Sequence, residues 1–503
     1  MTYVVSRNPA TGVESELDVV ETSAAQVNTL TELAASVALD FARRPLSWRA
    51  ALLREMADEL EGDADNLVNL ALDETALGRP RLEGELRRTC FQIRFFADVV
   101  DDGAFLNASI DHAKDSPMGP LPDLRRIRVP LGPVGVFGSS NFPFAFSVPG
   151  GDTASALAAG CPVVIKAHPA HPATSQACFD ALVRGARKGG APEGLLGLVY
   201  GFDAGVALVD APAIRAVGFT GSVLAGRALW ARANARAVPI PFFGELGAAN
   251  PLVVTPAAAK ERAIEIGAGF AGSMTLGVGQ FCTKPGLLFI PLDPSGDALL
   301  SALMDALGEL SPMTMLSEGI ADHFRSGSVT IADVDGNNRL VGGEGEGTSV
   351  SAQLFEVPAS VFADPSSTAL REECFGPLAI VIRYLSREDL SNALEVADAA
   401  LTFSVFTAPN DDNAAWLVEL GQTKAGRVIA NGFPTGVGVS WSMHHGGPWP
   451  ATTNSSATSV GASGIDRWLR PVTYQGVPEE LLPEALRDDN PLGVAQRVDG
   501  VLR

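Results

Sequence analysis

The sequence predicts an α/β fold, because short apolar runs of strand-forming residues alternate with alanine-rich helical stretches. From about residue 131 the strand-like runs are VGVFG, PVVIKAH, GLVYG and IRAVGFTG. The expected helices that follow such runs cover 151–159, 173–188 and 223–235. Glycine and proline at the joints complete a pattern that is typical of βαβ units around a parallel sheet.

A second block of the same kind begins at the strand-like run PLVVT (251–255). It continues through an expected helix at 257–272, the run GLLFI at 286–290 and an expected helix near 297–308. The chain has 503 residues, a length that favours more than one domain. Two α/β lobes with peripheral strands are therefore expected.

The first hundred residues are expected to be mainly helical. Ser23 is a suitable N-cap for a helix whose apolar residues keep helical spacing as far as Phe41. Ser47 is expected to open a second helix, and a third is expected to pass through Leu82 and Ile93.

The acidic charge balance argues against two classes of binding partner. The chain has 37 Lys and Arg against 58 Asp and Glu, a formal net charge of −21. Nucleic acid and anionic membrane surfaces select basic patches, so neither is expected to bind. The start of the chain lacks a basic stretch followed by an apolar run, and three prolines interrupt the charge-free stretch 131–151. A cytoplasmic protein without a membrane span is expected.

One cysteine is a candidate nucleophile. The five cysteines are scattered without CxxC spacing, so neither a disulfide framework nor a zinc ribbon is expected. Cys282 lies in the glycine-flanked segment GVGQFCTKPG. Such a loop can expose a thiol, and nearby backbone amides can lower the pKa of that thiol. The alternative is that Cys282 is a small buried apolar residue.

Two polar residues in apolar surroundings are candidate partners of this thiol. Glu245 lies in PFFGELGAANP, where apolar neighbours would raise the pKa of its carboxyl and suit it to act as a general base. Asn141, in SSNFPFAF, could donate a hydrogen bond to a developing oxyanion. A loop acid and a turn asparagine are the alternatives.

The carboxyl ends of parallel strands are where nucleotides bind in open α/β sheets. Lys166 ends the run PVVIK, and the segment GFTGS, with Gly221 and Ser222, ends a strand and opens a helix that could present amides to a pyrophosphate. A GxGxxG pattern at 267–272 falls inside an expected helix, so we attribute it to close helix packing and not to a cofactor loop.

The histidines do not show the spacing of a metal site. His168 and His171 alternate with prolines, and His444 and His445 are adjacent in MHHGGP. Neither pair fits a Cys/His or HExxH pattern, so no metal is expected.

These segments occur in an order that resembles the aldehyde dehydrogenase superfamily: Asn141, Lys166, GFTGS, GEL, QFCT and EECFGP. The resemblance implies a Rossmann-like cofactor domain (1–120 and 132–246), an α/β catalytic domain (247–459) and a small β oligomerisation flap with the tail (121–131 and 460–503). It also implies a homodimer or homotetramer. Ala248 departs from the family, in which a second glycine often follows the first.

The resemblance also assigns roles. Cys282 would attack the aldehyde carbon, Asn141 and the backbone N–H of Cys282 would stabilise the alkoxide, and Glu245 would activate the water that hydrolyses the thioester. Lys166 and Glu373 would hold the two riboses of a nicotinamide cofactor, and Gly221 and Ser222 would meet its pyrophosphate.

The residues that follow Lys166 bear on the choice between NAD and NADP. Relatives that prefer NAD often place an acid three residues after this lysine, where it repels a 2′-phosphate. Here that position is Pro169. NADP is therefore expected as the cofactor, with NAD as the alternative. His445 is considered as an extra base, but a loop histidine is the simpler interpretation.

The segments KAHPAHPATS, NGFPTGV and HHGGPWPATTNSSATSVG are similar to the branch with α-ketoglutaric semialdehyde (2,5-dioxovalerate) dehydrogenases and NADP-dependent fatty aldehyde dehydrogenases. We therefore expect a small-molecule aldehyde, with α-ketoglutaric semialdehyde preferred. The alternatives are a medium- or long-chain aldehyde and, from another class, a cysteine acyltransferase without nicotinamide. The substrate pocket is expected to draw on four aromatic residues, Phe142, Phe146, Phe281 and Phe433.

Overall fold

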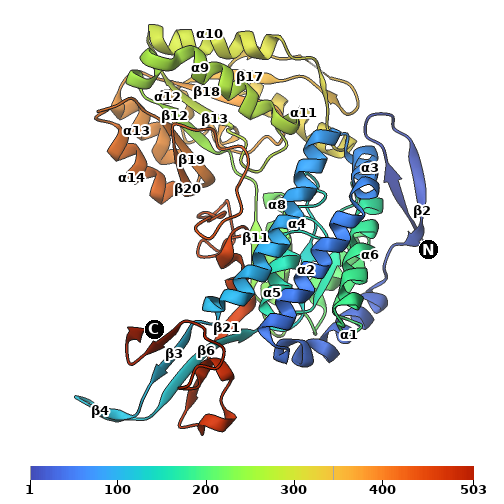
Figure 1. Cartoon of the computed structure of the whole chain (residues 1–503). Helices are drawn as coiled ribbons and strands as arrows, with labels where there is room; N and C mark the ends of the chain where they lie inside the picture. Colours follow the sequence, from blue (N-terminus) through green and yellow to red (C-terminus); the bar gives the residue numbers. More distant parts are fainter. Residues whose placement is uncertain (1, 344) are drawn as a thin grey trace.

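Three β-sheets organise the molecule in the computed structural model, which describes residues 2–343 and 345–503 (Figure 1). A five-stranded parallel sheet and its helices form one lobe, and a seven-stranded sheet and its helices form the other. A third sheet projects from the lower end of the first lobe and carries the C-terminus beside it (Figure 1). The α/β class predicted from the sequence is confirmed.

The first sheet is entirely parallel and has the order β11-β10-β7-β8-β9. Its strands are β7 (Val134–Phe137), β8 (Val163–Lys166), β9 (Leu196–Val199), β10 (Ala216–Thr220) and β11 (Phe242–Glu245). The helices that follow four of them are α5 (Gly151–Ala159), α6 (Pro172–Lys188), α7 (Phe202–Asp210) and α8 (Val223–Ala235). Because all five strands run in one direction, their carboxyl ends lie at one edge of the sheet.

Four long helices precede this sheet, namely α1 (Ala24–Arg43), α2 (Leu46–Gly62), α3 (Ala64–Thr75) and α4 (Arg79–Asp102). Ser23 caps α1 and forms a capping box with Gln26, as its position predicts. Ser47 does not open α2, because Pro45 occupies the N-cap and the helix begins at Leu46. Helix α3 was not predicted from the sequence, since the single residue Asp63 separates it from α2.

Helices cover both faces of the first sheet. Helices α5 and α6, with α2 and α4 outside them, bury apolar side chains on one face, and α1, α7 and α8 cover the other. A hairpin of β1 (Tyr3–Arg7) and β2 (Glu14–Val20) lies beside α3 and α6 (Figure 1). Burial on both faces explains why these strands are continuous apolar runs without polar alternation.

The second sheet has the order β15-β17-β18-β13-β12-β19-β20 and is parallel except at β15, which pairs antiparallel with β17. Its strands are β12 (Pro251–Val254), β13 (Leu287–Pro291), β15 (Asn338–Val341), β17 (Gln353–Pro358), β18 (Leu378–Tyr384), β19 (Ala400–Phe406) and β20 (Ala425–Ala430). One face is covered by α9 (Pro256–Thr275) and α10 (Pro294–Gly308). The other is covered by α11 (Glu318–Ala332), α12 (Ala359–Phe362), α13 (Arg387–Val396) and α14 (Ala414–Lys424). A short pair, β14 (Met313–Thr314) and β16 (Ser349–Val350), lies outside the sheet.

The third sheet joins segments from opposite ends of the chain in the order β21-β6-β3-β22-β23. Its strands are β3 (Ala108–Asp111), β6 (Leu124–Pro130), β21 (Leu469–Gln475), β22 (Gln496–Val498) and β23 (Val501–Leu502). The hairpin of β4 (Lys114–Ser116) and β5 (Gly119–Leu121) extends from it (Figure 1). The domain boundaries and the role of this flap in oligomerisation stay predictions. Within the described residues, no helix is both long and apolar enough to cross a bilayer.

The GxGxxG pattern lies inside α9, as predicted, and its first two glycines, Gly267 and Gly269, serve packing. A Cβ on Gly267 would lie 2.5 Å from the carbonyl oxygen of Leu299 in α10. A Cβ on Gly269 would lie 2.3 Å from the ring of Phe433. The two glycines therefore allow close approach of α9 to its neighbours.

We expect Gly267→Ala to lower the melting temperature, because forcing a methyl group into a packed contact costs about 1–3 kcal/mol. Gly272→Ala is the matched control, since a Cβ there meets no heavy atom within 4 Å. In that exposed position alanine should stabilise the helix by about 0.5–1 kcal/mol. Thermal unfolding followed by circular dichroism measures both shifts, and equal shifts would contradict the packing interpretation.

Candidate active site

The loop that carries Cys282 has an unusual backbone. It follows a short 3-10 helix (Leu276–Gly279) in which Gly277, Val278 and Gly279 have φ of +58°, +62° and +64°. Left-handed backbone is unfavourable for a β-branched residue such as Val278, and strain of this kind clusters at functional sites. The side chain of Cys282 is partly exposed, whereas the four other cysteines are buried.

Two contacts hold this loop against the second sheet. A Cβ on Gly279 would lie 2.4 Å from the backbone of Gly376, so only glycine fits there. The side-chain amide of Asn250 donates to the carbonyl oxygens of Cys282, at 2.7 Å, and Lys284, at 3.1 Å. The position of the thiol is therefore fixed by buried backbone contacts.

Glu245 is the last residue of β11 and is buried. The strand is tied to a later segment by hydrogen bonds from Leu246 N to Ala451 O, at 2.8 Å, and from Thr453 N to Gly244 O, at 3.0 Å. The hydroxyl of Ser459 donates to Oε2 of Glu245. The carboxylate thus receives its partners from a stretch about two hundred residues further along the chain.

His445 lies between the carboxylate and the thiol. Its Nε2 is 3.0 Å from Oε1 of Glu245 and 3.6 Å from Sγ of Cys282. The side chain is 0% exposed and comes from a loop segment. Its position between the two groups makes His445 a candidate base, and a catalytic role for it stays a prediction. The sequence contains little that would identify His445 as a site residue, since two adjacent histidines before Gly-Gly-Pro match no catalytic spacing.

The surroundings of this cluster reverse both pKa shifts expected from the sequence, a lowered pKa for the Cys282 thiol and a raised pKa for the Glu245 carboxyl. Burial raises the pKa of the Cys282 thiol well above its ordinary value, and the charge of Glu245 adds to the shift. Burial also tends to raise the pKa of Glu245, but the opposing effects of His445, Ser459 and Arg467 bring it below its ordinary value. The apolar sequence around Glu245 could not reveal these partners.

Asn141 lies in the loop after β7 and meets the cysteine loop from the first lobe. Its Nδ2 donates to the carbonyl oxygen of Gln280 at 2.9 Å, and its side chain is buried. The carbonyl oxygen of Asn141 accepts a hydrogen bond of 2.7 Å from Arg81 in α4. One amide hydrogen of Asn141 is left to donate to another acceptor near Cys282.

Aromatic rings line a pocket beside Cys282. The ring centroids of Phe142 are 5.2 Å from Phe146 and 5.1 Å from Phe281, and all three residues line the pocket. Phe433 does not line it, which corrects the expectation. Its ring packs against Gly269 of α9, with its centroid 5.0 Å from that of Phe406.

A model of the aldehyde dehydrogenase family matches residues 2–468 of the sequence. The chain belongs to this family. It is 46% identical over 484 residues to alpha-ketoglutaric semialdehyde dehydrogenase 2 of Azospirillum brasilense, and 40% identical over 482 residues to alpha-ketoglutaric semialdehyde dehydrogenase of Acinetobacter baylyi. Each alignment covers 95% of this chain and 91% of the relative.

The fold agrees with that of a solved family member at low sequence identity. Aldehyde dehydrogenase 21 of Physcomitrella patens, in complex with the reaction product succinate, has a TM-score of 0.80 at 20% identity, with 95% of each chain covered. The protein is therefore an aldehyde-oxidising oxidoreductase of a family that uses NAD or NADP.

Several groups of this aldehyde dehydrogenase suit a nucleotide cofactor. Lys166 ends β8 with its Nζ 5.1 Å from the ring centroid of Phe202, and burial lowers the pKa of this lysine to about 8. Gly221 and Ser222 are exposed after β10, where Ser222 caps α8. Lys166 and the start of α8 thus lie at the carboxyl ends of β8 and β10, two parallel strands with β7 between them, at the edge of the sheet where nucleotides bind.

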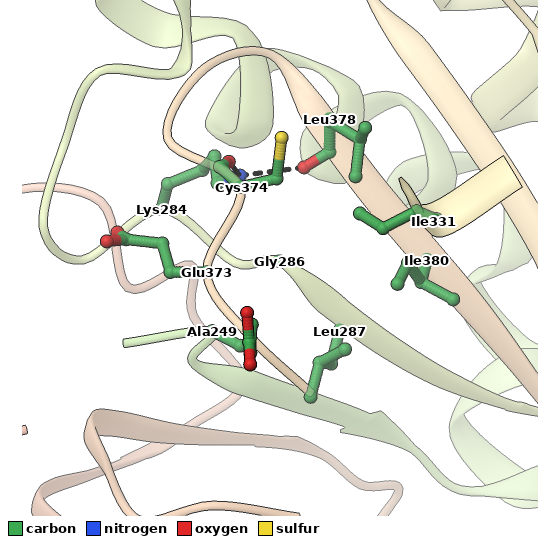
Figure 2. A pocket seen from close by; sticks show the side chains of 10 residues that line it. Ala249, Lys284, Gly286, Leu287, Ile331, Glu373, Cys374, Leu378 and Ile380 are labelled. Atoms are coloured by element: carbon green, nitrogen blue, oxygen red, sulfur yellow. Dashed lines mark hydrogen bonds between the residues drawn. The ribbon is translucent and has the colours of Figure 1, made fainter. Parts of the chain in front are cut away.

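Glu373 comes from the second lobe and has a buried oxygen, Oε1, without a hydrogen-bond partner in the described part of the chain. Burial raises the pKa of its carboxyl to about 7, although Lys284 opposes the shift. Figure 2 shows Lys284 bonded to the backbone carbonyls of Cys374 and Leu378, at 2.8 and 2.7 Å. Lys284 therefore fixes the segment that carries Glu373, and an unpaired buried carboxyl oxygen fits a ribose hydroxyl.

The three reactive side chains also form the one potential metal cluster among the described residues. The candidate ligand atoms of Glu245, Cys282 and His445 lie within 4.8 Å of one another. Two of these residues, Cys282 and Glu245, are also the candidate nucleophile and base of an aldehyde dehydrogenase. The expectation that the protein binds no metal stays a prediction.

Iodoacetamide alkylation tests the electrostatics of Cys282, because the reagent modifies the thiolate. We expect Glu245→Gln to react several-fold faster than the wild type at pH 8, since loss of the carboxylate charge lowers the pKa of the thiol. Peptide mapping should place the label on Cys282, and the four buried cysteines are internal controls. A slower reaction in the variant would mean that Glu245 promotes ionisation of the thiol.

Proposed function

We propose that the protein oxidises α-ketoglutaric semialdehyde to 2-oxoglutarate through a thioester on Cys282, with NADP as the preferred cofactor. The observation that carries the proposal is the cluster of Glu245, Cys282 and His445, in which the partly exposed Cys282 also lines a small pocket. The two relatives named for this semialdehyde, at 46% and 40% identity, support the choice of substrate.

In the first step His445 and Cys282 act together. A thiol whose pKa is raised needs a base. Nε2 of His445, 3.6 Å from the sulfur, accepts the thiol proton in the neutral tautomer that carries its hydrogen on Nδ1. The sulfur lone pair then forms a bond to the aldehyde carbon, and the carbonyl electron pair moves to oxygen. Nδ2 of Asn141 and the backbone N–H of Cys282 stabilise the alkoxide, and one such donor contributes about 10²–10³ in rate.

The second step is oxidation at the aldehyde carbon. A bound nicotinamide cofactor would supply the hydride acceptor for that carbon, and the acyl group would then remain on Cys282 as a thioester. Lys166 and Glu373 would hold the cofactor through its riboses, and Gly221 and Ser222 would contact its pyrophosphate. The left-handed loop and Asn250 keep the sulfur in a fixed position during this step.

In the third step Glu245 removes a proton from water. The low pKa of Glu245 keeps the carboxylate ionised and able to accept this proton at neutral pH. Oxygen of the water bonds to the thioester carbon, and the carbon–sulfur bond breaks. The acid leaves, and the thiolate recovers a proton through His445, which lies between the two groups.

The preference for NADP rests on the surroundings of Lys166. With a pKa of about 8 its ammonium remains charged at neutral pH and can attract a 2′-phosphate. Pro169, three residues later, brings no carboxylate that would repel the phosphate. The absence of a hydroxyl at Pro169 leaves the preference moderate, so turnover with NAD is also expected.

A medium- or long-chain aldehyde is the second candidate substrate. The walls formed by Phe142, Phe146 and Phe281 suit an apolar chain. The pocket also contains two arginines, Arg81 and Arg88, which a purely apolar substrate does not need. The arginines favour the semialdehyde, which carries a carboxylate.

An aldehyde panel with both cofactors tests this proposal. We expect kcat/KM to be highest for α-ketoglutaric semialdehyde with NADP, lower for the same aldehyde with NAD, and lower still for decanal. Reduced cofactor is followed by its absorbance. A higher kcat/KM for decanal would favour the fatty aldehyde reaction, and a higher value with NAD would contradict the cofactor preference.

Glu245→Gln should separate oxidation from hydrolysis. We expect a burst of reduced cofactor of about one equivalent per active site without further turnover, because the amide cannot accept a proton from water. Rapid mixing and acid quenching should recover an acylated Cys282 peptide. Steady turnover without a burst would show that another group, such as His445, activates the water.

A further inference from the structure

One face of α4 lines the pocket beside Cys282. Arg81, Gly84, Glu85 and Arg88 contribute to its wall, at the spacing of three and four residues that places side chains on one side of a helix. The opposite wall is formed by Phe142, Phe146 and Phe281 together with residues near Val437. Among the described residues that line the pocket, Arg81 and Arg88 are the two cations. The pocket therefore combines apolar walls with a charged helix face.

Two of the charged groups on this face are engaged through one of their polar ends, although Nη1 of Arg81 and Oε2 of Glu85 have no hydrogen-bond partner within the described residues. Arg81 packs its guanidinium between rings, 5.0 Å from the centroid of Phe142 and 4.7 Å from that of Phe281, and donates to the backbone of the Asn141 loop. Oε1 of Glu85 accepts hydrogen bonds from the backbone N–H groups of Phe144 and Ala145, at 2.8 and 3.0 Å. These contacts shape the loop that forms the aromatic wall.

Arg88 is different. Both of its terminal nitrogens, Nη1 and Nη2, are buried and have no hydrogen-bond partner within the described residues. Its guanidinium carbon lies 5.3 Å from the ring centroid of Phe146, so the group is positioned by an aromatic wall of the pocket. A buried guanidinium without an acceptor is destabilising, and a carboxylate that accepts two parallel hydrogen bonds would satisfy it.

We propose that Arg88 binds the carboxylate of the substrate and thereby selects a short ω-oxo acid over a neutral aldehyde of the same length. This inference rests on the proposed oxidation of α-ketoglutaric semialdehyde. In that substrate three carbons separate the aldehyde from the carboxylate, so a molecule held by Cys282 extends its charged end into the same pocket. Arg88 is a specificity residue and takes no part in the chemical steps.

The experiment compares kcat/KM for α-ketoglutaric semialdehyde and pentanal, a neutral five-carbon aldehyde, in the wild type and in Arg88→Met. We expect the ratio of the two values to fall roughly 10- to 100-fold in the variant, mainly through KM for the semialdehyde, since hydrogen bonds to charged groups are of this strength. Arg88→Lys should give an intermediate ratio, because lysine keeps the charge but not the paired donors.

Arg87→Met is the matched control, because Arg87 is the exposed neighbour on the same helix. The ratio of kcat/KM for the semialdehyde to kcat/KM for pentanal should be the same in this variant as in the wild type. The melting temperature gives an independent readout, since replacing an unpaired buried cation should not lower it. Addition of 2-oxoglutarate should stabilise the wild type more than Arg88→Met.

The outcomes separate this inference from the proposed function. If the wild type prefers the semialdehyde and Arg88→Met and Arg88→Lys keep the wild-type ratio, Arg88 does not bind the carboxylate. If both variants lose activity equally on both aldehydes and melt at a lower temperature, Arg88 has a structural role and the inference is overturned. If the wild type itself prefers pentanal, the proposed substrate is wrong.

Discussion

Burial of the Glu245 carboxylate is the constraint around which this site is built. A buried carboxylate requires partners, and His445 and Ser459 supply them. Both come from the segment that follows β20, so this segment must return to the edge of the first sheet. The backbone bonds between Gly244–Leu246 and Ala451–Thr453 hold it there. The same return places His445 against Cys282, which belongs to the second lobe.

The reactive centre is consequently an assembly of two lobes. The first lobe contributes the ends of β7 and β11, with Asn141 and Glu245, and the second contributes the loop before β13, with Cys282. The hydrogen bond from Asn141 to Gln280 joins the lobes directly at the nucleophile. Helix α4 closes the pocket from the side, where Arg88 remains available to a substrate anion. The proposed selection of the substrate by Arg88 and the proposed attack by Cys282 thus involve different elements of one pocket.

Much of the fold could be predicted because periodicity is a local property. The runs that became β7, β8, β10, β12 and β13 are buried on both faces, so each appears in the sequence as a continuous apolar stretch. The glycines of α9 were recognised as packing residues because their helical context was visible. The start of α2 and the existence of α3 were missed, since a proline N-cap and a one-residue break leave weak signals.

The sequence by itself determined the α/β class, the order of the motifs and the candidate residues Cys282, Glu245 and Asn141, because these depend on neighbours in the chain. Only the tertiary structure decided the place of His445, the directions of the pKa shifts of Glu245 and Cys282, the removal of Phe433 from the pocket and the unpaired state of Arg88. The physical reason is that burial and charge act between residues that are close in space. His445 lies two hundred positions from Glu245 in the sequence, yet 3.0 Å separates their polar atoms.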